Sequence, residues 1–267
     1  TTMFEMFYGA EAAHPDTTHW DTSNVTDMRL LFRETLVAEP DTHTWNTSSV
    51  TDMEAMFYGA ISANPDTSNW DTSNVTSLRS MFSGASVATP DTSSWNTSSV
   101  TNMEAMFSDA LLANPYTGSW DTSQVTTMAG MFSGTSLANP NTSGWNTSNV
   151  TNMTYMFSDA TAANSDTSGW DTSLVTDMSY MFENAIAAAP DTSGWDTSGV
   201  LKMSYMFRFT DIGTTSYSNF LIQVEATNQN DGLDLHGGSA TYNFLAGEAR
   251  QRLIDDHGWT ITDGGAA

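Results

Sequence analysis

The chain has no cysteine, and it has only 7 lysines and arginines against 31 aspartates and glutamates among its 267 residues, which gives a formal net charge of −24. The lack of cysteine excludes disulfides and thiolate metal sites. The shortage of cations predicts no nucleic-acid partner, because phosphate binding needs a patch of Lys and Arg. No apolar run approaches the roughly 18 residues of a membrane span, so we expect no direct membrane insertion.

What the chain does have is a 25-residue unit, clearest at residues 51–75 as TDMEAMFYGAISANPDTSNWDTSNV. Units begin without insertion or deletion at residues 1, 26, 51, 76, 101, 126, 151 and 176, and a ninth starts at 201. We number the slots of a unit 1 to 25 and call the same slot in successive units a column. The slots that never change in the eight full units include those of Phe7, Ala13, Thr17, Trp20, Thr22, Ser23 and Val25. Such a period predicts coils that each pack only on their neighbours.

Within the unit, the spacing of apolar residues predicts a short helix over residues 52–60. The apolar residues follow one another at spacings of three and four, which is the period of a helix; they are Val50, Met53, Met56, Phe57 and Ala60. Thr51 is suited to cap this helix, with Glu54 completing a capping box. A turn around Pro65 follows, and residues 68–72, rich in Thr and Trp, predict a short strand. The expected fold is an α/β solenoid, leucine-rich-repeat-like, with one short strand and one short helix in each of eight to nine coils.

The last 60 residues follow a different pattern and predict an α/β C-terminal cap. We expect helices over 216–226 and 242–256, a short strand around Leu233 and Leu235, and a final strand over 259–262. The domain organisation is therefore a repeat solenoid over 1–207 and a capping segment over 208–267. Because the first unit has no comparable cap, we expect the chain to be a processed product or a fragment of something longer.

The repeated string W-[DN]-T-S-x-V-T-x-M-x-x-M-F resembles the BspA-like leucine-rich-repeat family of bacterial surface proteins, also known from Mycoplasma-type surface lipoproteins. The resemblance covers residues 1–207, and the tail is similar to the closing unit of such arrays through Tyr242, Arg250, Leu253 and the segment 258–265. It implies an extracellular or cell-surface location and a role in adhesion. The chain departs from the family at Ala13 and Thr17 and their equivalents, where Phe and Ile are common.

The tryptophan column has two interpretations, an exposed aromatic ribbon or a buried ladder. Each ring can bury about 150–250 Å², and little else can fill so small a coil. We therefore predict a structural core made of Trp20, Trp45, Trp70, Trp95, Trp120, Trp145, Trp170 and Trp195.

Two columns of acidic side chains are candidate sites. The first is a candidate Ca²⁺ site, because calcium takes six to eight oxygen ligands. It comprises Asp16, Asp41, Asp66, Asp91, Asp166 and Asp191. The alternative is an aspartate that caps the turn in each coil, favoured because Tyr116 and Asn141 also occupy this slot. Apart from this possible Ca²⁺, we expect no cofactor.

The second acidic column alternates with asparagine, which keeps like charges two coils apart. Together with Asn69 it forms the candidate ligand-binding set, whose carboxylates are Asp21, Asp71, Asp121 and Asp171.

Catalysis finds no support in the sequence, and we expect a protein that is not an enzyme. The five histidines occupy no repeating slot and no metal-binding spacing; they are His14, His19, His43, His236 and His257. No glycine-rich phosphate loop is present.

The function expected from the sequence is an extracellular adhesion module that presents a repetitive polar face to a glycan or protein on another surface. One alternative is a structural repeat protein that assembles with copies of itself into a fibre or surface layer. A minor alternative is ice binding through the threonine columns at Thr17 and Thr22, although threonine also suits strands and turns.

Overall fold

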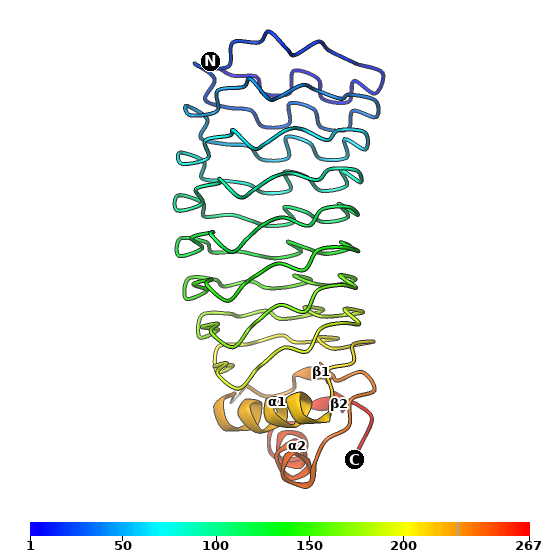
Figure 1. Ribbon diagram of the computed structural model, residues 1–267. Coiled ribbons are helices and arrows are strands. Elements are labelled where there is room, and N and C mark those ends of the chain that lie inside the picture. Colours follow the sequence, from blue (N-terminus) through cyan, green and yellow to red (C-terminus); the bar gives the residue numbers. More distant parts are fainter. Residues whose placement is uncertain (229) are drawn as a thin grey trace.

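The computed structural model describes residues 1–228 and 230–267. Its regular elements follow one another as helix α1 (Thr214–Thr227), strand β1 (Asp234–His236), helix α2 (Phe244–His257) and strand β2 (Thr260–Thr262). Residues 1–213, all of them described, contain turns and isolated bridges and no named helix or strand. Figure 1 shows this part as coils stacked one on the next, with both helices at the C-terminal end.

The stacking register is the 25-residue period of the sequence. Eight isolated parallel bridges join slot 2 of successive coils, from Thr2↔Asp27 to Asp177↔Lys202. Around each bridge, every second backbone N–H donates to a carbonyl of the next coil; in the third coil the donors are Met53, Ala55, Phe57 and Gly59. The N–H groups between them turn back inside their own coil, as Met56 does to Met53. The backbone is thus satisfied half within and half between coils.

The helix predicted over residues 52–60 is wrong, because this stretch is a run of consecutive turns. Ala55 and Gly59 have φ of 51° and 65°, which no α-helix contains. Stacking explains the difference. The Phe57 and Phe82 rings lie 5.6 Å apart, and the Trp45 and Trp70 rings 6.3 Å apart, so both columns repeat at nearly the same short distance. Helices about 10 Å thick do not fit that spacing. The leucine-rich-repeat-like class itself stays a prediction.

The strand predicted over residues 68–72 is also wrong. The N–H of Trp70 turns back to the carbonyl of Thr67, and threonine side chains join the coils instead. The hydroxyl of Thr67 donates to the Asp91 carbonyl at 2.7 Å, and that of Thr72 to the Asn96 carbonyl at 2.9 Å. Both threonines are fully buried. The columns at slots 17 and 22 therefore lie inside the protein, which removes them as an exposed ice-binding face.

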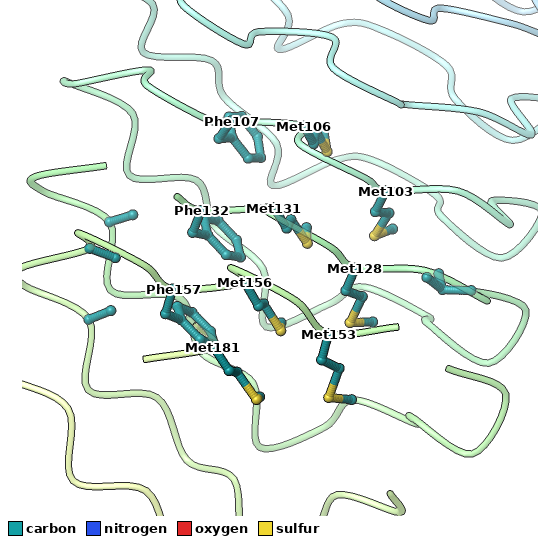
Figure 2. Packing of buried hydrophobic residues seen from close by; sticks show 14 of the residues in the cluster. Met103, Met106, Phe107, Met128, Met131, Phe132, Met153, Met156, Phe157 and Met181 are labelled. Carbon is teal, nitrogen blue, oxygen red and sulfur yellow. The ribbon is translucent and has the colours of Figure 1, made fainter. Parts of the chain in front are cut away.

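The core consists of columns of identical side chains that run along the stack. Figure 2 shows the methionine and phenylalanine columns, in which Met103, Met106 and Phe107 are fully buried. The tryptophans from Trp45 to Trp195 are 0–4% exposed and stack almost parallel where successive rings pair, whereas Trp20 in the first coil is partly exposed. Slots 3, 6, 7, 20 and 25 thus make one continuous thin core.

The C-terminal segment carries the regular elements expected from its pattern. Both helices are confirmed, with ends one or two residues from those predicted, and both short strands are confirmed. β1 and β2 are parallel, and Met203 of the last coil bridges to Leu235 of β1, so β1 continues the stack. Helix α1 covers the core, because Phe220 packs edge-on against Phe207 with ring centroids 5.1 Å apart.

Candidate binding surfaces

The outward side chains of the coils form two faces of different charge. The first, which we call the ladder face, comprises slots 2, 4, 5, 8 and 9. The second, the acidic face, comprises slots 14, 16, 18, 19, 21, 23 and 24. Five of the seven cationic residues lie on the ladder face and two in the cap; they are Arg29, Arg33, Arg79, Lys202 and Arg208, with Arg250 and Arg252. No lysine or arginine occupies any slot of the acidic face in the sequence.

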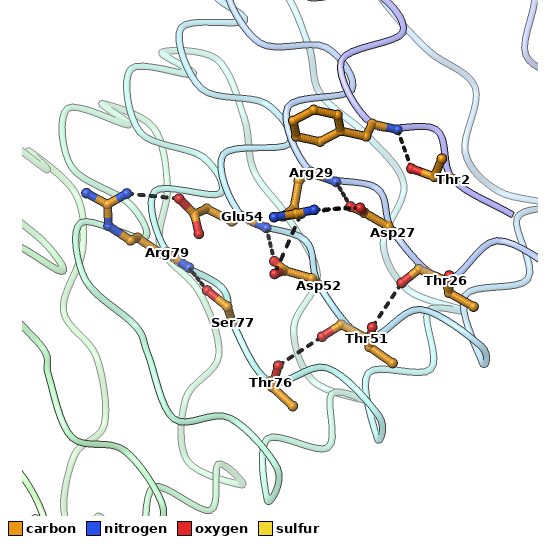
Figure 3. Close-up of polar contacts among 11 residues, drawn as sticks. Thr2, Thr26, Asp27, Arg29, Thr51, Asp52, Glu54, Thr76, Ser77 and Arg79 are labelled. Atoms are coloured by element: carbon orange, nitrogen blue, oxygen red, sulfur yellow. Dashed lines mark hydrogen bonds and ion pairs between the residues drawn. The ribbon is translucent and has the colours of Figure 1, made fainter.

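Cations on the ladder face pair with carboxylates of their own or neighbouring coils. Arg29 contacts Asp27 at 2.8 Å, and Arg79 contacts Glu54 at 2.9 Å (Figure 3). Arg79 also contacts Glu104 at 3.4 Å, so it bridges three coils. The hydrogen bonds that Arg29 donates to Asp27, and Arg79 to Glu54, raise the pKa of both arginines. These charges are used within the protein, and exposed pairs of this kind stabilise it only slightly.

The first acidic column caps turns. In Asp66 one carboxylate oxygen, Oδ1, accepts both the N–H of Ser68 at 3.0 Å and its hydroxyl at 2.6 Å. The backbone contact to the residue two positions on recurs in all six members, namely Asp16, Asp41, Asp66, Asp91, Asp166 and Asp191. Hydrogen bonds from that residue's side chain and N–H lower the pKa of each carboxyl. This is the geometry of an Asx turn.

The second acidic column has the same geometry. Oδ1 of Asp71 accepts the N–H of Ser73 at 2.9 Å. Hydrogen bonds from the side chain and the N–H of Ser73 lower the pKa of the carboxyl. Equivalent bonds are made by Asp21, Asp121 and Asp171. All four carboxylates and Asn69 are exposed on the same face.

Among residues 1–228 and 230–267, no group of three His, Asp or Glu is placed to hold a metal ion. Calcium binding stays an untested alternative to turn capping.

A row of exposed aliphatic side chains, missed from the sequence, borders the acidic face. Slots 11 and 12 are the central residues of a turn that in most coils is closed by a hydrogen bond such as that from Ala63 N–H to the Ala60 carbonyl. Eight large aliphatic side chains there are 38–59% exposed. This apolar ridge consists of Leu36, Val37, Ile61, Val87, Leu111, Leu112, Leu137 and Ile186. Its signal in the sequence is the recurrence of aliphatic residues between two alanine slots that point inward.

A hollow of about 190 Å³ lies where the last coil meets the cap. This junction hollow is lined by Ser204, Tyr205, Asp234, Leu235, His236, Thr260 and Thr262. Tyr205 ends a row of stacked rings on the ladder face, because its centroid lies 5.1 Å from that of Tyr180 and 5.8 Å from that of His236. Although the hollow contains Ser, His and Asp, no hydrogen bond joins these three side chains to one another among the described residues, so they form no nucleophile–base pair.

Comparison with known proteins gives one finding. The family model described as "Mycoplasma protein of unknown function, DUF285" matches residues 1–116 and 112–220. The two matches together cover most of the chain, which therefore belongs to this family. Neither the curated proteins nor the solved structures yielded a match. No helix in the described part of the chain is both long and apolar enough to cross a membrane.

Proposed function

We propose that this member of the DUF285 family is an extracellular adhesion module that binds a protein on another surface through its apolar ridge and acidic face. The observation that carries the proposal is the apolar ridge. Single exposed aliphatic side chains are ordinary, but a row of them rimmed by polar groups is typical of a protein interaction site. In this chain the row extends from the second coil to the sixth and resumes at Ile186 in the eighth.

The chemistry of the partner follows from what lies beside the ridge. The turn that carries the ridge leads within a few residues to the first acidic column, whose carboxylates are held outward by their Asx turns. Since hydrogen bonds lower the pKa of these carboxyls, they remain charged well below neutral pH. No lysine or arginine lies in the acidic face to neutralise them, although Asp41 contacts the ring of His43. The complementary partner carries apolar side chains next to lysine or arginine.

Repetition supplies the strength of binding. Six of the eight coils add one or two large aliphatic side chains to the ridge, and six carry a turn carboxylate in slot 16, all at a fixed spacing. Contacts that are individually weak add together when they are held on one rigid body, because later contacts form at a high effective concentration. Such a surface fits adhesion better than the capture of one small molecule.

The proposal is tested with an immobilised amphipathic peptide of leucine and lysine, measured by surface plasmon resonance against the same peptide with glutamate in place of lysine. We expect saturable, salt-sensitive binding to the lysine peptide alone. The double variant Leu111→Ser/Leu112→Ser should bind at least about tenfold more weakly, since burying each leucine contributes roughly 1.5–3 kcal/mol.

The matched control is Leu201→Ser, which removes an exposed leucine outside the ridge. Equal binding by the ridge variant and the wild-type chain would refute the assignment of the ridge. If the purified chain instead forms filaments and ignores both peptides, the structural-repeat hypothesis becomes the better one. Antibody labelling of intact source cells tests the extracellular location.

A further inference from the structure

The junction hollow is built from three neighbouring backbone segments. β1 and β2 pair in parallel, with Asp234 opposite Thr260 and His236 opposite Thr262. Because alternate residues of a strand point to the same face, these four side chains project together. Ser204 follows Met203, which bridges to β1, and it brings a further hydroxyl to the same hollow.

Four side chains of this hollow make no hydrogen bond to the rest of the protein in the described chain. In the coils, most buried threonine hydroxyls and the turn aspartates are occupied by bonds within and between coils, as in Thr67 and Asp66. In the described chain, by contrast, no hydrogen bond involves the side chain of Ser204, Asp234, Thr260 or Thr262. Three hydroxyls and a carboxylate therefore converge on one hollow without an internal partner.

His236 adds a donor of defined position. The N–H of Gly238 donates to its Nδ1 at 3.1 Å. Burial, together with the positive charge of Arg208, lowers the pKa of this imidazole, so the ring is neutral near pH 7. A neutral ring whose Nδ1 accepts carries its proton on Nε2, which can donate to a ligand. The hollow thus offers donors and acceptors side by side.

The size and charge of the hollow select the class of ligand. A volume of about 190 Å³ holds one ring-sized group and is smaller than the roughly 300–1,000 Å³ of sites for drug-sized ligands. Anions are disfavoured by Asp234 and by the net charge of −24. The ring of Tyr205 supplies an aromatic wall. A ligand that fits these donors, acceptors and wall has closely spaced hydroxyl groups on a ring of C–H groups.

We propose that the junction hollow binds one saccharide unit. Asp234 accepts from sugar hydroxyls, His236 Nε2 donates to a ring or hydroxyl oxygen, and Thr260 and Thr262 do either. The Tyr205 ring packs against the C–H groups of the sugar ring. This site lies on the ladder-face side of the cap and uses none of the residues of the apolar ridge, so it stands independently of the proposed adhesion surface.

The test is a titration of the full chain with glucose, galactose, mannose and N-acetylglucosamine, followed through the amide resonances of His236 and Thr262. At least one sugar should give saturable shifts confined to β1, β2 and the last coil. Asp234→Asn should weaken that binding about tenfold or more, and Thr260→Val/Thr262→Val should abolish it. The valines keep the branched shape that strands favour, so the cap should still fold.

Asp91→Asn is the matched control, because the same slot naturally carries Asn141 and the change removes one carboxylate far from the hollow. It should leave the sugar affinity unchanged. Absence of saturable shifts with all four sugars overturns the proposal, as does an affinity that is equal in the wild-type chain and both hollow variants. Because the ridge variant is expected to bind sugar normally, failure of one proposal can be told from failure of the other.

Discussion

Replacing Thr117 by valine tests whether buried hydroxyls hold the coils together. Thr117 is 1% exposed, and its hydroxyl donates to the Asn141 carbonyl of the next coil at 2.8 Å. Valine keeps the shape but loses the hydrogen bond, and it leaves the carbonyl without that donor. An unsatisfied buried group costs about 1–3 kcal/mol, and burial of one more methyl returns about 0.8 kcal/mol. We expect the free energy of unfolding to fall by about 1–2 kcal/mol.

Urea denaturation followed by tryptophan fluorescence measures this change. The matched control is Thr126→Val, because the Thr126 hydroxyl also bonds to a neighbouring coil, to the Thr101 carbonyl at 3.1 Å, but is exposed. Water can replace that bond, so the control should change stability by less than about 0.5 kcal/mol. Equal effects of the two substitutions, or a more stable Thr117→Val chain, would refute the role assigned to the buried column.

Three further predictions concern the core, the pH dependence and calcium. Phe107→Ala should lower the free energy of unfolding by about 3–5 kcal/mol in the same assay, and Phe7→Ala, at a partly exposed ring of the first coil, by clearly less; equal losses would contradict the continuous core. Because the pKa of turn carboxyls such as that of Asp66 is lowered on folding, their contribution to stability is present above the unfolded pKa of about 3.9 and is lost as the pH falls through the folded value. The melting temperature should therefore drop below about pH 4, and a constant one would contradict this. Millimolar Ca²⁺ against chelator should leave the melting temperature unchanged, whereas a rise of many degrees would make the first acidic column a metal site.

The register and the cap could be predicted from the sequence, because both depend on patterns that are local in one unit or one element. An uninterrupted 25-residue period fixes which residues meet, and the bridges join Asp52 to Ser77 accordingly. Asn243 precedes α2 and caps it through its side chain, and Gly258 ends it with a φ of 67°. Short-range signals of this kind do not depend on the neighbouring coils.

The internal structure of a coil could not be predicted in the same way. Apolar residues at spacings of three and four face inward in a helix and also in consecutive turns. The turns form because alternate backbone N–H groups donate to carbonyls of the next coil, which the sequence of one unit does not show. Ala55 gives no sign of its positive φ, although Gly59 and Gly84 in slot 9 hint at theirs. Nor does the sequence show that Thr67 is buried, because its hydroxyl partner lies 24 residues away.

The candidate sites divide similarly. Turn capping by the aspartates was one of two interpretations of a local pattern, and the Asx hydrogen bonds agree with it. The junction hollow depends on pairing between Asp234 and Thr260, which are separated in the sequence by helix α2. No sequence motif indicates this pairing. The apolar ridge is not evident from the sequence, because the spacing of the aliphatic residues in slots 11 and 12 does not show whether they point inward or outward.

The one-way pattern of hydrogen bonds between coils gives the stack an electrical direction. In each of the eight full coils, four backbone N–H groups donate to carbonyls of the C-terminal neighbour, and in most coils the two buried threonine hydroxyls do the same. The backbone N–H groups that donate to a carbonyl of the preceding coil are those of slot 1, as in Thr51 to Thr26, and scattered side chains such as that of Asn74 also donate backward. The peptide dipoles therefore add along the axis, as they do in a helix. Partial positive charge gathers toward the cap and partial negative charge at the first coil, so the dipole favours a head-to-tail over a head-to-head approach of two stacks.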